Sequence, residues 1–215
     1  PGYGFLSENP EFARLCQEAG ICFIGPEPDV MEKMGDKIYS RKLARKAGLP
    51  ILSGTDEAVA NENAATKAWE LGFPLMVKAA EGGGGIGIHI IDSQEELMPL
   101  IERTRQVAES AFGSSRLFFE RYLKEASHIE VQLIGDQHGN LVHLYERDCS
   151  VQRRNQKLVE ETPSSAKLTP RLRRRVCSLA TKLGNYIGYT STGTVEFLVT
   201  ADGSVFFLEM NTRIQ

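Results

Sequence analysis

The stretch Phe73-Pro-Leu-Met-Val-Lys78-Ala-Ala-Glu-Gly82-Gly-Gly-Gly-Ile-Gly87-Ile-His-Ile-Ile91 places a run of glycines between two apolar, strand-like segments. Four consecutive glycines lose much conformational freedom on folding and add no side-chain packing, so a buried structural turn explains them poorly. Glycine-rich backbone can direct several N–H groups at one anion, and Lys78 could add a point charge to the same phosphate. We therefore interpret the stretch as a mobile flap over a phosphate group.

The residues around the glycines distinguish between kinds of phosphate site. The P-loop pattern, a glycine and four residues followed by Gly-Lys-Ser/Thr, is absent. Gly82, Gly84 and Gly87 satisfy G-x-G-x-x-G, but that fingerprint needs a helix next, and here Ile-His-Ile-Ile follows. A flap between two antiparallel strands over a nucleoside triphosphate remains. A surface hairpin without a ligand is the alternative.

Composition and charge indicate an ordinary globular chain of one or two domains. The 215 residues carry a formal net charge of -3, which gives no electrostatic basis for nucleic-acid binding. No apolar run approaches the roughly 20 residues that span a bilayer. The cysteines and histidines lack metal-ligand spacing, so we expect reduced thiols and a cytoplasmic protein.

The first part of the chain suggests the end of a Rossmann-like domain. Residues 11–19 have an amphipathic helical pattern, residues 21–24 are predicted to be a short buried strand, and residues 29–47 are predicted to be a second helix. Because the chain starts without methionine and stops directly after a strand-like segment, we interpret it as a fragment. We expect a remnant of an N-terminal domain over 1–29 and a second domain over 30–215, truncated at its end.

The glycine stretch lies in a block that could form a small lid domain. Helices are predicted at 63–71 and 93–111, on either side of the two strands, and extended linkers bracket the block at about 50–121. Residues 117–123 are predicted to be a strand that leaves the lid. Such a connector in a nucleotide cleft could serve adenine through its backbone groups.

The remaining half of the chain is predicted to be a half-buried sheet with one helix. Residues 128–134 alternate polar and apolar residues, and after a turn a second strand at 141–146 returns, which favours a hairpin. Residues 146–157 are too polar for a core strand, so they form either a solvated loop or a cleft-lining segment that handles anions. Thr169 and Pro170 are typical of a helix start, and this helix presents an exposed basic run.

Two glutamates are predicted to face each other in a second hairpin. If Asp202 and Gly203 form a two-residue turn, Glu196 lies directly opposite Glu209. Both strands are otherwise apolar, so the carboxylates are expected to be buried and to need a cation. Asn211 and Arg213 share the face of Glu209, so the site offers the oxygen ligands that Mg²⁺ prefers. The alternative is that one glutamate is neutral or paired with a basic residue.

Motifs along nearly the whole chain closely resemble the biotin carboxylase family of ATP-grasp ligases. They are Gly2-Tyr-Gly-Phe-Leu-Ser-Glu-Asn9, Met34-Gly-Asp-Lys37, Lys78-Ala-Ala with the glycine run, His128-Ile-Glu-Val-Gln132, Glu146-Arg-Asp-Cys-Ser through Gln152-Arg-Arg-Asn-Gln-Lys157, and Glu209-Met-Asn-Thr-Arg-Ile-Gln215. The resemblance implies an α/β (α+β) ATP-grasp fold with a mobile lid and a mixed-sheet core.

The same resemblance implies roles for individual residues. Phosphates of ATP would meet Lys37, Lys78 and the lid glycines Gly83, Gly84 and Gly85. Adenine and ribose would be held by Glu120, Arg121, Leu123, His128, Gln152 and Asn155. Mg²⁺ or Mn²⁺ would be bound by Glu196, Glu209 and Asn211. Bicarbonate would be held by Lys157, Arg213 and Gln215, with Tyr3 near biotin.

The reaction implied by the resemblance is ATP-driven phosphorylation of bicarbonate to carboxyphosphate, followed by carboxylation of biotin on a carrier protein. Phosphoryl transfer needs positioning and charge neutralisation rather than a protein nucleophile, which suits these residues. The implied partners are a biotin carboxyl carrier protein or domain, a carboxyltransferase component and a second copy of the full-length protein. We expect an acetyl-CoA or acyl-CoA carboxylase type, and we expect the fragment alone to be inactive.

Three positions depart from the usual family pattern. Ile86 replaces an arginine, Asn155 replaces a histidine, and Arg121 stands where lysine is frequent. The first two resemble urea carboxylase-type members, which leaves the final acceptor open. A protein kinase fails on spacing, because no Asp-Phe-Gly occurs and asparagine follows Arg147-Asp148 at the wrong distance. Another ATP-grasp ligase and a non-catalytic ATP-binding module are the remaining alternatives.

Overall fold

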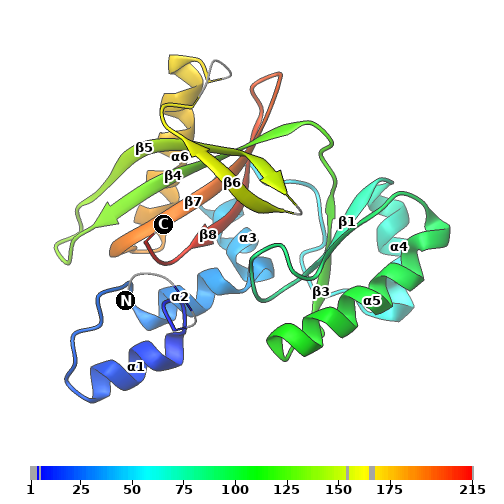
Figure 1. Ribbon diagram of the computed structural model, residues 1–215, viewed down its shortest axis with the longest axis horizontal. Coiled ribbons are helices and arrows are strands. Elements are labelled where there is room, and N and C mark those ends of the chain that lie inside the picture. Colours follow the sequence, from blue (N-terminus) through cyan, green and yellow to red (C-terminus); the bar gives the residue numbers. More distant parts are fainter. Residues whose placement is uncertain (1–3, 5, 154, 165–167, 215) are drawn as a thin grey trace.

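The computed structural model describes residues 4, 6–153, 155–164 and 168–214. It contains two separate sheets, a small one in the lid and a larger one in the body of the molecule (Figure 1). The predicted α/β architecture with a lid is therefore confirmed. No helix in these ranges is both long and apolar enough to cross a membrane.

The lid is a three-stranded antiparallel sheet, in the order β2-β1-β3, covered on one face by two helices. Its core is aliphatic and aromatic, with Leu75 and Val77 of the central strand fully buried against Leu97 and Ile101. The elements are α4 (Asn61–Leu71), β1 (Leu75–Ala79), β2 (Ile88–Ile91), α5 (Gln94–Phe112) and β3 (Leu117–Arg121).

The glycine stretch forms the connection between antiparallel β1 and β2, as the sequence predicts. Gly82, Gly84, Gly85 and Gly87 all have positive φ, a conformation that side chains with a Cβ adopt only with strain. A strand follows the glycines, so the rejection of a dinucleotide fingerprint is confirmed.

The larger sheet is antiparallel, in the order β6-β5-β4-β7-β8, with one additional parallel bridge between Ile51 and Phe207. Residues of its strands alternate between two environments. On β4, Ile129, Val131 and Leu133 pack into the main core, while His128 and Glu130 point to the other face. The strands are β4 (Ala126–Gly135), β5 (Leu141–Arg153), β6 (Gln156–Glu161), β7 (Ser191–Thr200) and β8 (Val205–Asn211).

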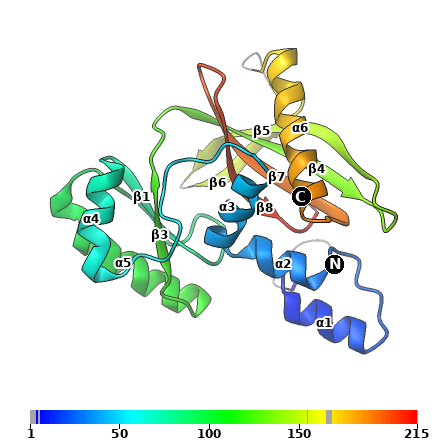
Figure 2. The same ribbon diagram turned by 180° about the vertical axis from the view of Figure 1, so that it is seen from behind.

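Helices cover the apolar face of this sheet (Figure 2), and residues of its polar face line a cavity together with residues of the lid. The longest of them starts at the N-cap Thr169, whose side chain accepts a hydrogen bond from the N–H of Leu172, as predicted. The helices outside the lid are α1 (Pro10–Glu18), α2 (Pro28–Gly35), α3 (Lys37–Lys46) and α6 (Pro170–Tyr186).

Two predictions for the first 50 residues are wrong. Residues 21–24 form no strand, because Ile21 and Ile24 are exposed (60% and 79%) and no neighbouring strand pairs with them. The single helix predicted over 29–47 is broken at Asp36, whose backbone is extended and whose carboxylate caps α3 by accepting from the N–H of Tyr39 at 2.9 Å. The break makes Lys37 the first residue of a helix.

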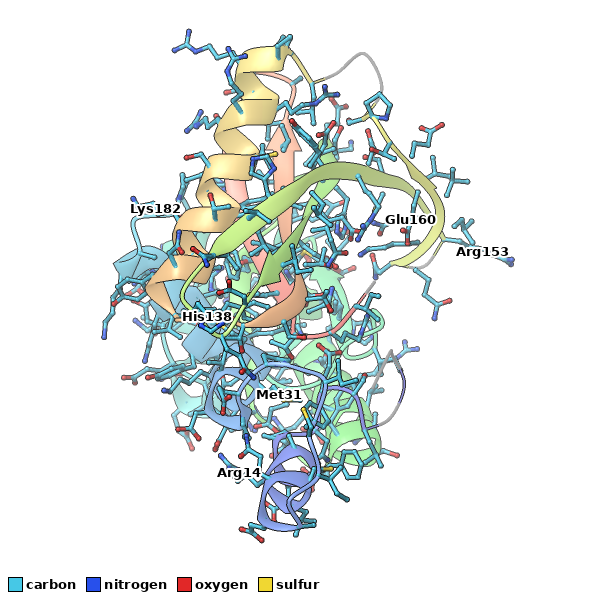
Figure 3. All side chains as sticks on the ribbon, turned by 90° about the vertical axis from the view of Figure 1, so that its left-hand side faces the viewer. Arg14, Met31, His138, Arg153, Glu160 and Lys182 are labelled. Carbon is cyan, nitrogen blue, oxygen red and sulfur yellow. The ribbon has the colours of Figure 1, made fainter. Side chains whose placement is uncertain are left out.

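The predicted strand 117–123 does not leave the lid. Its residues up to Arg121 pair with β1 in the lid sheet, so β3 is a lid strand, and the exit follows it. The polar segment 146–157 is not a solvated loop. Its residues up to Arg153 belong to β5, and its last two residues, from Gln156, begin β6. Figure 3 shows Arg153 pointing outward from this β5–β6 hairpin.

Glu196 pairs with Glu209 in the hairpin of β7 and β8, as predicted, but the turn and the register differ from the prediction. The turn is not a two-residue turn, because the N–H of Thr200 bonds the carbonyl of Ser204 at 3.0 Å, which leaves three residues in the loop. The register then shifts between Glu196 and Phe197, and Leu208 is the extra residue on β8. The longer loop shifts the register by one residue, and the bulge shifts it back, so Glu196 still lies opposite Glu209.

Candidate nucleotide and metal site

A cavity of about 520 Å³ lies between the lid and the polar face of the larger sheet. Residues from both units line it, so the topology brings distant parts of the chain together. Most of the residues predicted for the site line it: Lys37, Lys78, Gly83, Gly84, Gly85, Arg121, Leu123, His128, Gln152, Asn155, Lys157, Glu196, Glu209, Asn211 and Arg213. Tyr3 and Gln215 lie outside the described residues.

Lys37 connects the lid glycines to the carboxylates of the sheet. Its ammonium donates to the carbonyl of Gly82 and lies 3.4 Å from a carboxylate oxygen of Glu209. Its backbone N–H donates to the carbonyl of Ala80 at 2.8 Å, which fixes the start of α3 against the lid. A cation at this point can meet a ligand phosphate between the flap and the sheet.

Glu120 is the one described residue of the predicted set that does not line the cavity. Its carboxylate is 1% exposed and is bonded to Arg41 and Lys78. The side chain therefore supports Lys78 from behind the cavity wall, and a direct contact between the Glu120 carboxylate and adenine is not supported by its position.

The lining of the cavity includes both apolar and polar side chains. Met76 and Ile88 from the lid and Leu198 from β7 supply apolar surface of the kind that receives a flat base. Nearby, the amide nitrogen of Gln152 lies 2.8 Å from Nδ1 of His128, which ties β5 to β4. These apolar residues were missed by the sequence reasoning, because each is an ordinary strand residue.

The carboxylate of Glu196 is held by three neighbouring side chains. One oxygen accepts from Lys157 and from Asn211, each at 2.6 Å, and the other lies 2.7 Å from Nε2 of His128. That imidazole nitrogen points poorly for a hydrogen bond to it. Burial raises the pKa of Glu196, but the contacts with His128 and Lys157 outweigh it and lower the pKa to about 2.

Lys157 lies between two buried carboxylates. Its ammonium donates to Glu130 at 2.5 Å and to Glu196 at 2.6 Å. Burial lowers the pKa of Lys157, but the charges of Glu196 and Glu130 outweigh that effect and raise it. The side chain therefore stays cationic and can hold an anion, but it is a poor proton acceptor.

Glu130 was not among the predicted site residues, although it belongs to the His128–Gln132 motif. It is fully buried and also accepts from Nε of Arg147 at 2.5 Å. Strand alternation places it on the same face as His128 and Gln132, and this signal could have found it.

Arg213 lines the cavity and is held by a residue more than 200 positions earlier. Its Nε donates to Glu8 at 3.0 Å, and the other oxygen of Glu8 accepts from the backbone N–H of Thr212 at 2.8 Å. This contact joins the N-terminal segment to the end of β8. Local sequence patterns carry no sign of such a long-range pair.

The donor set on β7 and β8 fits a magnesium or manganese ion. Glu196, Glu209 and Asn211 offer two carboxylates and an amide oxygen within one cavity, which are the hard ligands that Mg²⁺ prefers. Both carboxylates already have a cationic neighbour: Lys157 lies against Glu196, and Lys37 lies against Glu209. His128, Glu130 and Glu196 also place one ligand atom each within 4.8 Å of one another.

The fold and the cavity together define an ATP-grasp domain. The family model described as "Carbamoyl-phosphate synthase L chain, ATP binding domain" matches residues 36–215, and the model "Biotin carboxylase, N-terminal domain" matches residues 1–31. The chain belongs to the biotin carboxylase family of ATP-grasp enzymes.

Known relatives match the whole chain. A pyruvate carboxylase subunit from Methanothermobacter thermautotrophicus is 50% identical over 216 residues, covering 100% of this chain and 44% of the relative. The crystal structure of a biotin carboxylase complex with β-γ-ATP from Campylobacter jejuni has a TM-score of 0.97 and 44% identity, covering 100% of this chain and 48% of that one.

A further crystal structure shows the biotin carboxylase domain dimer of Hydrogenobacter thermophilus 2-oxoglutarate carboxylase with MgADP, ADP and bicarbonate. Its TM-score is 0.96 at 50% identity, with 100% of this chain and 48% of that chain covered. The chain thus spans less than half the length of the relatives named here.

Proposed function

We propose that the protein containing this chain is a biotin carboxylase, which uses ATP and bicarbonate to carboxylate biotin on a carrier protein. The observation that carries the proposal is the arrangement of cations around one cavity. All four line the cavity: Lys37 and Lys78 come from α3 and β1, and Lys37 donates to the carbonyl of Gly82 and also lies 3.4 Å from Glu209. Lys157 and Arg213 come from β6 and the end of β8, where Lys157 is held by Glu130 and Glu196 and Arg213 by Glu8. An enzyme that joins a phosphoryl group to a second anion needs these two separate sets of cations.

Each set has a defined task in this proposal. Lys37 and Lys78 bind the phosphates of ATP, and closure of the glycine flap excludes water from them. Glu196, Glu209 and Asn211 hold Mg²⁺ or Mn²⁺, which neutralises charge on the transferring phosphate. Lys157 and Arg213 orient bicarbonate, and the carboxylates around Lys157 keep that lysine protonated while it does so. Gln215 and Tyr3 keep the bicarbonate and biotin roles that the resemblance implies.

The final carboxyl acceptor is part of the proposal. The names of two relatives, a pyruvate carboxylase and a 2-oxoglutarate carboxylase, favour a 2-oxo acid. The acetyl-CoA or acyl-CoA acceptor expected from the sequence is the alternative, and urea is a third. The partners in each case are a biotin carrier and a carboxyltransferase component, with a homodimer of the full-length protein and a cytoplasmic location.

We further propose the domain division expected from the sequence. Residues 1–29 end an N-terminal domain, residues 30–215 belong to the ATP-grasp domain, and residues 50–121 form its lid. The matches of two separate family models, on either side of about residue 33, support this division.

The test is release of ADP by the full-length protein, with free biotin and a range of bicarbonate concentrations. ADP release that requires both bicarbonate and biotin is the expected result. Release that is independent of bicarbonate, while another carboxylate or amine substrate stimulates it, would assign the protein to a different class of ATP-grasp ligase. The acceptor is then identified with the carrier and carboxyltransferase present, by supplying pyruvate, 2-oxoglutarate, acetyl-CoA and urea in turn.

A further inference from the structure

Three charged side chains from three elements meet behind the lid wall of the cavity. Arg41 comes from α3, Glu120 from β3 and Lys78 from β1, and they are 2%, 1% and 6% exposed. One carboxylate oxygen of Glu120 accepts from Nη1 of Arg41, and the other accepts from the ammonium of Lys78. The group joins the body of the molecule to the lid.

Arg41 is held in place independently of Glu120. Its Nη2 donates to the carbonyl of Leu52 at 2.8 Å, and its guanidinium carbon lies 5.7 Å from the centre of the Phe118 ring. Lys78 lines the cavity, whereas neither Arg41 nor Glu120 is among the described residues that do. A ligand in the cavity would thus contact Lys78 and leave Arg41 untouched.

The charges of the three groups do not cancel. Two cations share one carboxylate, so the group carries one positive charge in excess. Because the three side chains are almost fully buried, solvent and salt screen this charge weakly. If Arg41 were absent, Lys78 and Glu120 would form a neutral pair. The wall of the cavity would then attract an anion less strongly.

We propose that Arg41 is a positioning residue that neutralises Glu120, so that the charge of Lys78 remains available to the polyphosphate of a nucleotide. Glu120 fixes the ammonium in place, and Arg41 prevents that contact from consuming its charge. The inference rests on the proposed function, because it takes the ligand of the cavity to be ATP. It assigns to Arg41 a task that involves no contact with the nucleotide.

The first experiment compares Arg41→Met with Arg45→Met in the full-length protein. Arg45 lies one turn further along α3, is about half exposed and pairs with Asp56 at the surface, so it is a matched control. Binding of ATP with Mg²⁺ is measured by titration calorimetry, and thermal unfolding is followed in parallel. We expect Arg41→Met to weaken binding by about 10-fold or more, as for loss of one buried charge partner, and Arg45→Met to leave it unchanged.

The second experiment restores the charge balance. In the double variant Arg41→Met/Glu120→Gln, Lys78 is again the one unneutralised charge of the group, so nucleotide binding should return to within about 3-fold of the wild-type value. A purely structural role for Arg41 predicts the opposite, because the second substitution removes another hydrogen-bonding partner. Since the double variant contains no unpaired buried carboxylate, it tests the idea even if Arg41→Met alone does not fold.

Two results would overturn the inference. One is wild-type affinity in a folded Arg41→Met variant, and the other is a double variant that binds ATP about 10-fold or more weakly than the wild type. Failure of the wild-type protein to bind ATP would instead refute the proposed function. The effect should also lie in the KM for ATP more than in kcat, because Lys78 binds the nucleotide before and during transfer.

Discussion

At the scale of single residues, Lys157 shows how neighbours decide what a side chain can do. Two buried carboxylates hold its ammonium and raise its pKa, so it is suited to holding an anion and unsuited to accepting a proton. A lysine in a less acidic position would be a candidate base. The proposed task of Lys157 with bicarbonate follows from its charge and from its position between Glu130 and Glu196, away from the lid contacts of Lys37 and Lys78.

Substitution of Lys157 by glutamine tests that task. In the full-length enzyme, Lys157→Gln should sharply reduce bicarbonate-dependent ADP release, while ATP affinity changes little because Lys37 and Lys78 remain. The measurement is a bicarbonate titration of ADP release together with direct nucleotide binding. A variant that loses ATP binding but keeps its bicarbonate dependence would move Lys157 to the nucleotide site.

Glu209 provides a second test at this scale. Its carboxylate faces Glu196 across the hairpin and both line the cavity, so loss of its charge would remove one of the proposed metal ligands. We expect Glu209→Gln to weaken binding of ATP with Mg²⁺, or turnover, by about 10-fold or more. Isothermal titration with and without Mg²⁺ separates the metal effect, and equal metal dependence in both proteins would refute the assignment.

Spacing and resemblance selected residues that the structure brings to one cavity, but they missed the distant side chains that support them. The lysines, the glycines and the two carboxylates proposed to bind a metal line that cavity, and their roles stay predictions. Arg41 and Glu8 were not found, because each acts on a partner far along the chain. Glu120 was found, but the structure places its side chain behind the cavity rather than in it.

At the scale of elements, His89 connects β2 to α5 in the lid. Its Nδ1 lies 2.8 Å from the hydroxyl of Thr104, and that hydroxyl donates to the carbonyl of Leu100. Burial, and secondarily the charge of Arg103, lowers the pKa of His89 below its ordinary 6.5. The folded lid therefore binds a proton less readily than the unfolded chain does.

This pKa direction predicts acid weakening of the lid. The neutral His89 side chain contributes fully to the stability of the lid above the pKa of the unfolded chain's histidine, about 6.5. This contribution is lost as the pH falls through the pKa of His89 in the folded lid. Hydrogen exchange of the β2 amides should therefore accelerate between about pH 8 and pH 5 beyond the intrinsic change, and His89→Gln should abolish this excess. His138→Gln, at an exposed turn, is the control. The idea fails if the two variants show the same pH dependence as the wild type.

Element prediction was accurate where one strong local signal dominated. Threonine and proline marked the start of α6, and the glycines marked the β1–β2 connection. It failed at residues 21–24, where an apolar run without a partner strand stays exposed, and at Asp36, where a cap divides a continuous helical pattern. The first failure reflects a missing partner strand and the second a local side-chain cap, and hydrophobic periodicity contains neither.

At the scale of the whole molecule, the linker that enters the lid runs beside β3, the last strand of the lid. The N–H of Thr55 donates to the carbonyl of Phe119 at 2.9 Å, and the N–H of Arg121 donates to the carbonyl of Ser53 at 2.8 Å. The entry linker is thereby bonded to the strand after which the chain leaves the lid, so the chain enters and leaves the lid at one place. The contact of Arg116 with Asp36 at 2.8 Å is partly exposed and can open at less cost than the buried pair of Arg41 and Glu120.

This arrangement predicts a lid that moves as one body. Saturating ATP should protect the amides of residues 82–87 from hydrogen exchange, because the flap closes on the phosphates. The amides of α6, on the opposite face of the larger sheet, provide the internal control and should change little. Equal exchange of residues 82–87 with and without nucleotide would exclude the motion.

The bulge at Leu208 has a consequence for anyone who wishes to redesign this hairpin. With the three-residue loop and no extra residue, Leu208 would oppose Glu196, and Glu209 would oppose Val195, whose side chain lies in the apolar core. Regularising the ladder, which is a common way to stabilise a sheet, would thus turn the carboxylate of Glu209, a proposed metal ligand, inward among hydrocarbon side chains. The site owes its second carboxylate to a single irregular residue, and an insertion or deletion there would be more damaging than many substitutions in the cavity itself.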